Sequence, residues 1–294
     1  MSWEVKKAVI PVAGMGVRFL PATKTIPKEL FPIVDRPTVL YVVEEAYRAG
    51  IEQVVFVTAS GKHAIEDFFD QSFGLEKFLE AKGRHRELEL VRQVSNMVEV
   101  ITVRQKEPKG LGHAVYCARH IVQNEPFCVL LGDDLIDSDV PCIKRMVDVA
   151  QKHEKAVIAA CRVPKDKVSR YGIIEGELIE DRVVDVARMV EKPKPEETTS
   201  DIAIIGRYVL PPEVFDILRD LPPGVGGEIQ LTDALIKLND EGCGVLGYLF
   251  EGIRYDAGDI YGFIEANIAY AMKRPDLEAK LKELFKRYIK DEDQ

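Results

Sequence analysis

The 294-residue chain lacks the marks of several protein classes. It has only five cysteines and no C-x-x-C pair, which argues against a disulfide framework or a zinc site and predicts free thiols in a reducing cytoplasm. No apolar run comes near the ~20 residues that a membrane span needs. The apolar stretch after Lys6 and Lys7 is broken by Pro11, so it is not a signal-peptide core.

The charge balance of the chain argues against general nucleic-acid binding. The formal net charge is −9, and general nucleic-acid binding usually needs a basic face. A single nucleotide is a different ligand, because one phosphate site needs only a few local cations. The composition itself is ordinary, 46% hydrophobic and 30% charged. It predicts a globular protein whose core is large enough to be stable without disulfide or metal cross-links.

Short β-branched segments alternate with helical segments in the first half of the chain. Strands are expected over 7–12, 53–58, 98–104, 127–131 and 156–161, and helices over 37–49, 112–122 and 139–153. This alternation predicts a mostly parallel sheet covered by helices on both faces. Between residues 61 and 97 the helix signals continue without a strand, which predicts a helical insertion.

From Gly172 the pattern changes to antiparallel ribbons with tight turns. Ribbon strands are expected over 172–175, 177–180 and 182–190, followed by a strand over 203–209, a helix over 228–239, a strand over 245–250 and two closing helices. The last helix, predicted over 276–290, carries a broad apolar stripe. Its members are Leu277, Leu281, Leu284, Phe285, Tyr288 and Ile289.

The first strand runs into the loop Ala13-Gly14-Met15-Gly16, and Arg18 follows it. Glycines at a strand end let a phosphate approach the backbone, and a guanidinium beside exposed amides can clamp a polyphosphate. The dinucleotide fingerprint fails because Phe19 stands where a third small residue is needed, and no Walker A ending follows. Taken alone, the loop is more typical of a tight turn with a surface arginine.

Lys28 and Glu29 lie in a loop with prolines on both sides, which hold it extended. Such a loop can aim Lys28 at the same phosphates, although a solvated Lys–Glu pair is the plainer interpretation. Asp133 and Asp134 follow a predicted strand, and Asp256 follows another apolar stretch. Mg²⁺ usually takes one or two protein carboxylates and completes its shell with phosphates and water. A turn with two aspartates is otherwise commonplace.

Gln105 and Gly110 form a candidate base site. The Gln105 amide can donate and accept at once, as the imide edge of uracil requires, and Gly110 lets the backbone approach a base closely. In the second half, the Glu191 carboxylate suits two sugar hydroxyls and the Lys192 ammonium suits a sugar phosphate. An exposed Glu–Lys pair and a loop glycine are the structural alternatives.

Together these segments resemble the signature of the sugar-1-phosphate nucleotidylyltransferase family. G-x-G-x-R is followed by P-K-E-L-x-P-I-x-D-R-P. Further matches follow in order: Arg104-Gln105, Lys109-Gly110-Leu111-Gly112-His113-Ala114, Leu131-Gly132-Asp133-Asp134, Tyr171-Gly172, Val190-Glu191-Lys192-Pro193, Gly227-Glu228-Ile229-Gln230-Leu231-Thr232-Asp233 and Tyr255-Asp256-Ala257-Gly258. Val17 and Asp259 depart from the usual pattern, and neither replaces an expected catalytic group.

The resemblance implies an α/β fold with a Rossmann-like mixed, mostly parallel sheet flanked by helices, a smaller antiparallel sugar-binding part and C-terminal helices. One domain over 1–294 is expected, with a nucleotide-binding half (1–165), a sugar-binding half (166–258) and C-terminal helices (259–294). The stretch at 22–24, the insertion and the 227–233 segment favour the uridylyl branch. That branch uses UTP and glucose 1-phosphate and gives UDP-glucose and pyrophosphate, with Mg²⁺.

The resemblance also implies roles for individual residues. The catalytic set is Arg18, Lys28 and Lys192; the nucleotide set is Ala13, Gly14, Gly16, Glu29, Gln105 and Gly110; the sugar set is Gly172, Glu191 and Lys192; and the magnesium ligands are Asp133 and Asp256. The family is typically oligomeric, so a cytoplasmic homodimer or homotetramer is expected. The alternatives are a thymidylyl- or other uridylyltransferase, a metal-dependent glycosyltransferase, and a non-catalytic module on this fold.

Overall fold

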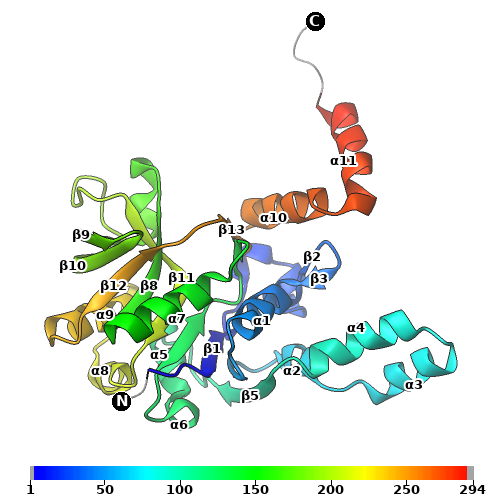
Figure 1. Ribbon diagram of the computed structural model, residues 1–294, viewed down its shortest axis with the longest axis horizontal. Coiled ribbons are helices and arrows are strands. Elements are labelled where there is room, and N and C mark those ends of the chain that lie inside the picture. The colour runs from blue at the N-terminus through cyan, green and yellow to red at the C-terminus, as the bar shows by residue number, and fades with distance from the viewer. Residues whose placement is uncertain (1–2, 290–294) are drawn as a thin grey trace, which may run out of the picture.

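Nine strands form one mixed sheet at the centre of the computed structural model, which describes residues 3–289 (Figure 1). Their spatial order is β5 (Glu99–Arg104), β4 (Gln53–Thr58), β1 (Lys7–Pro11), β6 (Phe127–Leu130), β11 (Ile202–Leu210), β8 (Ala156–Arg162), β12 (Val245–Leu249), β10 (Val183–Glu191) and β9 (Gly172–Glu180). The four strands from β5 to β6 are mutually parallel. The β11 strand then runs antiparallel to both β6 and β8. The predicted mixed α/β sheet is therefore confirmed.

The sheet separates two apolar cores because successive strand residues point to opposite faces. Along β1, Ala8 and Ile10 enter the first core and Val9 enters the second, and all three are fully buried. The first core is covered by α1 (Thr38–Arg48) and α7 (Cys142–His153). The second is covered by α5 (Leu111–Cys117), α6 (Arg119–Val122), α8 (Val214–Asp220) and α9 (Leu231–Asp240).

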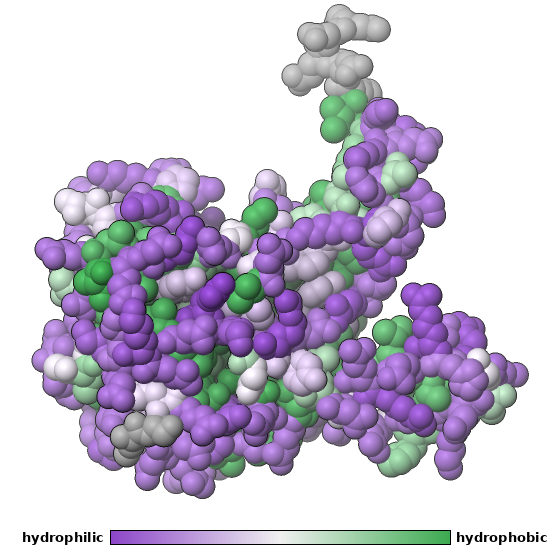
Figure 2. Space-filling model, in the orientation of Figure 1, coloured by the Kyte–Doolittle hydropathy of each residue, from purple (hydrophilic) through white to green (hydrophobic). Residues whose placement is uncertain are grey.

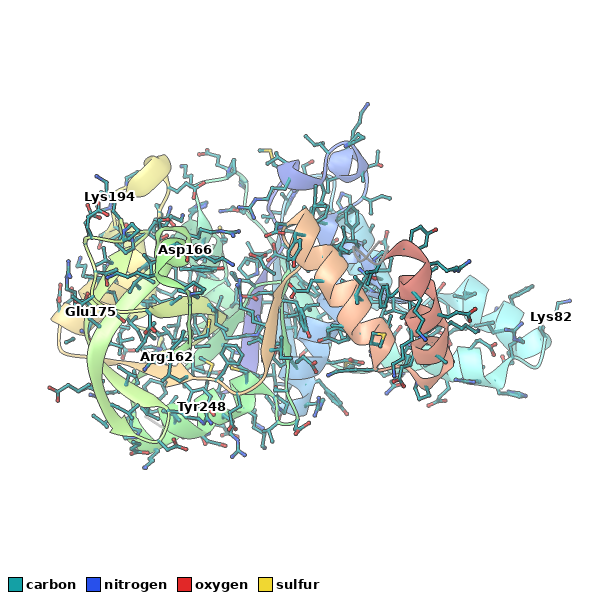
Figure 3. The ribbon with its side chains drawn as sticks, turned by 90° about the horizontal axis from the view of Figure 1, so that it is seen from above. Lys82, Arg162, Asp166, Glu175, Lys194 and Tyr248 are labelled. Carbon is teal, nitrogen blue, oxygen red and sulfur yellow. The ribbon has the colours of Figure 1, made fainter. Side chains whose placement is uncertain are left out.

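The predicted insertion between residues 61 and 97 is helical. It consists of α2 (His63–Phe69), α3 (Phe73–Ala81) and α4 (His85–Ser95). The α3 and α4 helices pack on each other and extend away from the sheet (Figure 1). Viewed from above, Lys82 marks the tip of the insertion, far from Arg162, Asp166, Glu175 and Lys194 in the antiparallel part (Figure 3).

Two helices close the described chain, α10 (Ile260–Met272) and α11 (Pro275–Tyr288). The α11 helix packs on α10, projects from the body and buries none of its residues (Figure 1). Apolar surface extends along this projection (Figure 2). The predicted span of 276–290 matches α11 closely, and Lys290 lies outside the described residues.

Two short ribbons were not expected from the sequence. One pairs β7 (Asp134–Asp137) with β13 (Ile253–Asp256), and the other pairs β2 (Pro32–Ile33) with β3 (Arg36–Pro37). Short 3-10 turns complete the chain: η1 (Val17–Phe19), η2 (Ala22–Lys24), η3 (Lys28–Leu30), η4 (Lys165–Arg170) and η5 (Val225–Gly227). No helix within residues 3–289 combines the length and apolarity of a bilayer span.

Some predicted boundaries were wrong. The helix expected from Asp139 begins at Cys142, because Pro141 takes the N-cap position with extended backbone and makes a natural start. The single helix expected over 112–122 is two helices, α5 and α6, which meet at Ala118.

Two further boundaries differ in the second half. The helix expected from Glu228 begins at Leu231, because Gln230 is still extended. The ribbons expected over 172–175 and 177–180 are one strand, β9, which pairs with β10 through a register shift between Val186 and Arg188. A bulge keeps the hairpin continuous where a break had been predicted.

Candidate active site

The chain order reverses at the centre of the sheet. From β1 the chain goes on to β4 and β5 on one side, whereas β6 lies on the other side. In open α/β sheets, ligands bind at such a switch point, outside the carboxyl ends of the strands. The loop after β1 holds Gly14 and Gly16, and the loop after β6 holds Asp133, so both predicted motifs lie at this point.

Two cavities open near these strand ends. The first, of about 430 Å³, is lined by Ala13, Lys28, Lys62 and Gln105, among others. The second, of about 260 Å³, is lined by Gly172, Glu191, Lys192 and Asp256, among others. Of the predicted nucleotide residues, Ala13 and Gln105 line the first cavity, together with Lys28. The predicted sugar residues Gly172, Glu191 and Lys192 all line the second.

Lys28 and Asp133 form an ion pair between the two loops. Lys28 comes from η3, and its Nζ donates a hydrogen bond to Asp133 Oδ2. Burial raises the pKa of Asp133, but the charge and hydrogen bond of Lys28 outweigh it and the net pKa is lowered. Burial likewise opposes the charge of Lys28, and the Asp133 carboxylate raises its pKa overall. Both groups are therefore held ionised.

The β7–β13 ribbon places Asp256 beside this pair. Asp256 stands opposite Asp134 in the ribbon register. A Cβ at Gly258 would lie 2.4 Å from Asp133 Oδ2 and 3.0 Å from Asp256 Oδ1, so both carboxylates converge on the bare Cα of that glycine. Burial raises the pKa of Asp256, as do the nearby carboxylates of Asp134 and Asp133, against the Arg254 guanidinium. Two converging hard oxygen donors with unfavourable mutual charge fit a divalent cation such as Mg²⁺.

Asp134 has a different role from its neighbour. Its Oδ1 accepts from Arg254 Nε at 2.7 Å, and its Oδ2 accepts from the Gly206 N–H at 2.9 Å. The side chain is buried, with both oxygens engaged inside the protein. Asp134 also lines the second cavity, but both of its oxygens are engaged, and the choice of Asp133 as the metal ligand stays a prediction.

A buried ion pair that was not predicted from the sequence lies next to Asp134. Arg207 on β11 is fully buried, and its Nε and Nη2 donate to Glu45 Oε2 on α1 at 3.0 and 2.8 Å. The same guanidinium donates to the carbonyls of Gly206 and Asp134 at 2.9 and 2.6 Å. This network ties α1 and β11 to the start of β7, which carries Asp134.

The loop after β1 is stabilised by a local contact. Thr23 Oγ1 donates to the Gly16 carbonyl at 2.7 Å, and Gly14 is exposed. Arg18 lies on η1 with an exposed side chain, and its charge contributes to the electrostatics of Lys28. The structure therefore brings Arg18 near Lys28 but leaves its guanidinium in solvent.

Glu29 is paired with a lysine that sequence analysis did not single out. Lys62, which follows β4, donates from Nζ to Glu29 Oε2 at 2.8 Å, and both side chains are buried. Burial raises the pKa of Glu29 and lowers that of Lys62, while their mutual attraction opposes both shifts. A lysine in the loop after a buried parallel strand was the available signal, since β4 ends at the same edge as β1.

Gln105 follows β5, and its amide already has partners in the chain. Nε2 donates to the Gly110 carbonyl at 3.1 Å and lies 3.0 Å from His113 Nδ1. The amide nitrogen is thus engaged within the chain, and the expectation that Gln105 binds the base stays a prediction. Its backbone N–H donates to the Thr58 carbonyl at 2.9 Å, which fixes the residue to β4.

The second cavity brings together the end of β10 and the start of β9. Glu191 stands opposite Gly172 in the register of these strands. Lys192 follows with φ of 47°, an unusual left-handed conformation for a lysine, and its N–H donates to the Tyr171 carbonyl at 3.0 Å. Its ammonium lies 3.3 Å from Glu191 Oε1 and is half exposed. Arg254 and Tyr171, which also line this cavity, were missed as site residues.

Comparisons with known proteins identify the family of the chain. The family model described as nucleotidyl transferase matches residues 7–273. The UTP–glucose-1-phosphate uridylyltransferase of Staphylococcus epidermidis is 48% identical over 283 residues, covering 96% of this chain and 98% of that protein. The protein of the same name from Bacillus subtilis is 49% identical over 278 residues, covering 95% of each chain.

Solved structures give the same result. A UDP-glucose pyrophosphorylase in complex with UDP-glucose superposes with a TM-score of 0.85 at 43% identity, covering 92% of this chain and 100% of that one. A UTP-bound UGPase from Acinetobacter baumannii has a TM-score of 0.86 at 40% identity, covering 96% and 99%. The predicted family resemblance is confirmed, and the chain belongs to the nucleotidyl transferase family.

Proposed function

We propose that this enzyme transfers the UMP group of UTP to glucose 1-phosphate, giving UDP-glucose and pyrophosphate. The observation that carries the proposal is the pair of cavities, one lined by Lys28, which pairs with Asp133, and the other lined by Asp256. Relatives nearly half identical over almost the whole chain are named for this reaction, and similar structures hold UDP-glucose or UTP.

UTP occupies the first cavity, within the nucleotide-binding half of residues 1–165. Gln105 and Gly110 contact the base. The loop that holds Ala13, Gly14 and Gly16 contacts the phosphates. The Glu29 carboxylate helps to keep Lys28 charged. Arg18 and Lys28 bind the triphosphate and the pyrophosphate that leaves. Arg18 is exposed, as expected for a clamp at the open side of a cavity.

Glucose 1-phosphate occupies the second cavity, within the sugar-binding half of residues 166–258. Gly172 and Glu191 contact the sugar, and Lys192 orients its phosphate. A phosphate oxygen of glucose 1-phosphate attacks the α-phosphorus of UTP, a new P–O bond forms, and the bond from the α-phosphorus to the leaving pyrophosphate breaks. Positioning and charge neutralisation supply the catalysis, and no protein nucleophile takes part.

Asp133 and Asp256 are the residues that would hold Mg²⁺. When bound, the ion offsets negative charge at the α-phosphate. Lys28 neutralises Asp133, and burial raises the pKa of Asp256. A cation held by Asp133 would leave the Lys28 ammonium available to bind a phosphate.

Labelled UTP tests the proposed reaction directly. With glucose 1-phosphate, the α-phosphate label is expected in UDP-glucose and the γ-phosphate label in pyrophosphate, in equal amounts. A thymidylyltransferase would prefer dTTP in the same assay. A glycosyltransferase would leave UTP intact and consume UDP-glucose, and that result would overturn the proposal.

Lys28→Ala and Lys192→Ala are expected to weaken different substrates. Lys28→Ala raises the KM for UTP and for pyrophosphate in the reverse reaction, whereas Lys192→Ala raises the KM for glucose 1-phosphate. Loss of one charge-assisted contact costs about 1.5–3 kcal/mol, roughly 10- to 100-fold. Steady-state kinetics in both directions measure the pattern. Exposed Lys194, two residues beyond Lys192, provides a control, and Lys194→Ala should match the parent. Identical substrate patterns for the first two variants would contradict these roles.

We also propose that α11 packs against a second copy of the chain, making a homodimer or a homotetramer. The stripe of Leu281 and Phe285 covers α10 only in part, and Tyr288 and Ile289 are 79% and 68% exposed. An apolar face of this kind invites association, and closed symmetry favours a dimer or a dimer of dimers.

Light scattering on the full chain measures this assembly. An oligomer is expected, and Leu281→Glu with Phe285→Glu is expected to reduce its mass to that of a smaller species. Lys280→Glu with Lys286→Glu places two glutamates at exposed positions of the helix, with an even larger change of charge, and should leave the mass unchanged. A monomeric full-length protein would contradict the proposal, as would a folded apolar-stripe variant that keeps its mass.

A further inference from the structure

Gln105, Gly110 and His113 form a small polar cluster, and Gln105 is the member that lines the first cavity. Gln105 lines the cavity just after β5, Gly110 precedes α5, and His113 lies in the first turn of α5. Gln105 Nε2 lies 3.1 Å from the Gly110 carbonyl oxygen and 3.0 Å from His113 Nδ1. Its two amide hydrogens thus have two partners.

The Gly110 carbonyl fixes which end of the amide faces the protein. A carbonyl oxygen only accepts hydrogen bonds, so the group next to it must be the NH₂ of Gln105 and not the amide oxygen. Reversal would bring two oxygens together and lose the contact. Within residues 3–289, no hydrogen bond reaches Gln105 Oε1, which leaves this acceptor for a ligand.

The position of Gly110 is itself fixed. It has φ of 96°, and a Cβ there would lie 2.7 Å from Glu228 Cβ and 2.9 Å from the Ile229 carbonyl oxygen. The Ile229 N–H donates to Lys109 and the Gly112 N–H donates to Ile229, both at 2.8 Å. The start of α5 is therefore held from both sides by the 228–229 segment.

His113 must be neutral, with its proton on Nε2, to accept at Nδ1. Burial lowers the pKa of His113, and the nearby Lys109 ammonium lowers it further, against Glu107. On the other side of the ring, Nε2 lies 4.0 Å from Cys117 Sγ, a weak partner for an N–H. An imidazolium would instead point an N–H at the NH₂ of Gln105.

We propose that His113 is a positioning residue that, with the Gly110 carbonyl, holds Gln105 so that only Oε1 faces the base. The inference rests on the proposed function and adds a rule for base choice. Uracil and thymine carry a hydrogen on N3 and donate it to Oε1. Cytosine has an unprotonated N3, so its lone pair would face Oε1. Selection against cytosine thus depends on the fixed orientation of the Gln105 amide. The hydrogen bond to His113 is one of the two that fix this orientation.

The test compares UTP with CTP in His113→Leu and His113→Asn. Leucine removes the acceptor and lets the amide turn, so the ratio of kcat/KM for UTP to that for CTP is expected to fall about tenfold or more, mainly through the KM for UTP. Asparagine places an oxygen near the position of Nδ1 and is expected to restore most of the ratio. Exposed His120 on α6 gives the control, since His120→Leu should leave the ratio unchanged.

An unchanged ratio in folded His113→Leu, or an asparagine variant no better than leucine, would overturn the proposal. Nitrogen-15 NMR of the parent protein provides a test that needs no variant. His113 is expected to show a proton on Nε2 and none on Nδ1, and a proton on Nδ1 would contradict the inference. If the parent makes no UDP-glucose, the proposed function fails; calorimetric binding of UTP against CTP then still decides the base rule.

Discussion

Asp133→Asn and Asp256→Asn are each expected to lower turnover by about 10²–10³-fold, the loss seen when one preorganised electrostatic group is removed from an active site. Both carboxylates converge on Gly258, and an amide in place of either would offer a divalent cation one neutral oxygen. Pyrophosphate release across a Mg²⁺ titration measures the effect, and thermal unfolding checks that the fold is intact.

Asp139→Asn provides the matched control for these substitutions. Asp139 is an exposed carboxylate shortly after β7, and its replacement should leave turnover and Mg²⁺ dependence unchanged. Near-parent turnover of Asp133→Asn or Asp256→Asn at every Mg²⁺ concentration would exclude that residue as a metal ligand. A large loss of turnover in Asp139→Asn would show that turnover responds to the removal of any carboxylate rather than to a change at the site.

Arg207→Met is expected to lower the free energy of unfolding by about 3–5 kcal/mol, because it leaves the Glu45 carboxylate buried without its partner. Arg207 is fully buried, and the Asp134 and Gly206 carbonyls would lose a donor as well. Urea unfolding followed by circular dichroism measures the change. Since the guanidinium bonds the start of β7, turnover is expected to fall together with stability.

The double variant Glu45→Leu with Arg207→Met separates the unpaired charge from the lost packing. Replacing a buried ion pair by apolar groups is often near neutral, so the double variant should be more stable than Arg207→Met alone. The exposed pair of Lys282 and Glu278 provides a comparison, and Lys282→Met should change stability by less than about 1 kcal/mol. A double variant less stable than the single one would refute the charge argument.

The sequence predicts local structure well where hydrophobic period and strand–helix alternation agree. The strands β1, β4, β6 and β8 and the helix α1 were expected within one or two residues, because each is a short apolar run or a clear amphipathic face. The insertion was recognised for the same reason. The boundaries that failed, at Cys142 and Leu231, depend on whether a few polar residues before a helix join its first turn.

Long-range pairing was not predictable from local pattern. The β7–β13 ribbon brings Asp256 opposite Asp134, and the two segments are joined by Arg254 and Asp134 across 120 residues of chain. Each strand has only four residues, too short to stand out by alternation. Asp133 and Asp256 were chosen as partners through the family resemblance, and their convergence is a tertiary result.

In the candidate site, too, sequence motifs predicted some residues, whereas others depend on tertiary contacts. Motifs located Lys28, Gln105 and Glu191, because each follows a strand or lies in a constrained loop. The Lys62–Glu29 pair and the orientation of the Gln105 amide depend on which groups the fold brings together. A residue type states what a side chain can donate or accept, and only its buried neighbours decide which of these remains available to a ligand.

A substrate matrix tests the assignment most directly. The purified protein is incubated with Mg²⁺ and each pairing of UTP, dTTP, CTP, ATP and GTP with glucose, galactose and mannose 1-phosphates, and pyrophosphate is measured as kcat/KM. We expect UTP with glucose 1-phosphate to give the highest value and every CTP pairing to be poor. Pyrophosphate release that does not depend on a sugar 1-phosphate, or a maximum at a purine triphosphate, would contradict uridylyl transfer.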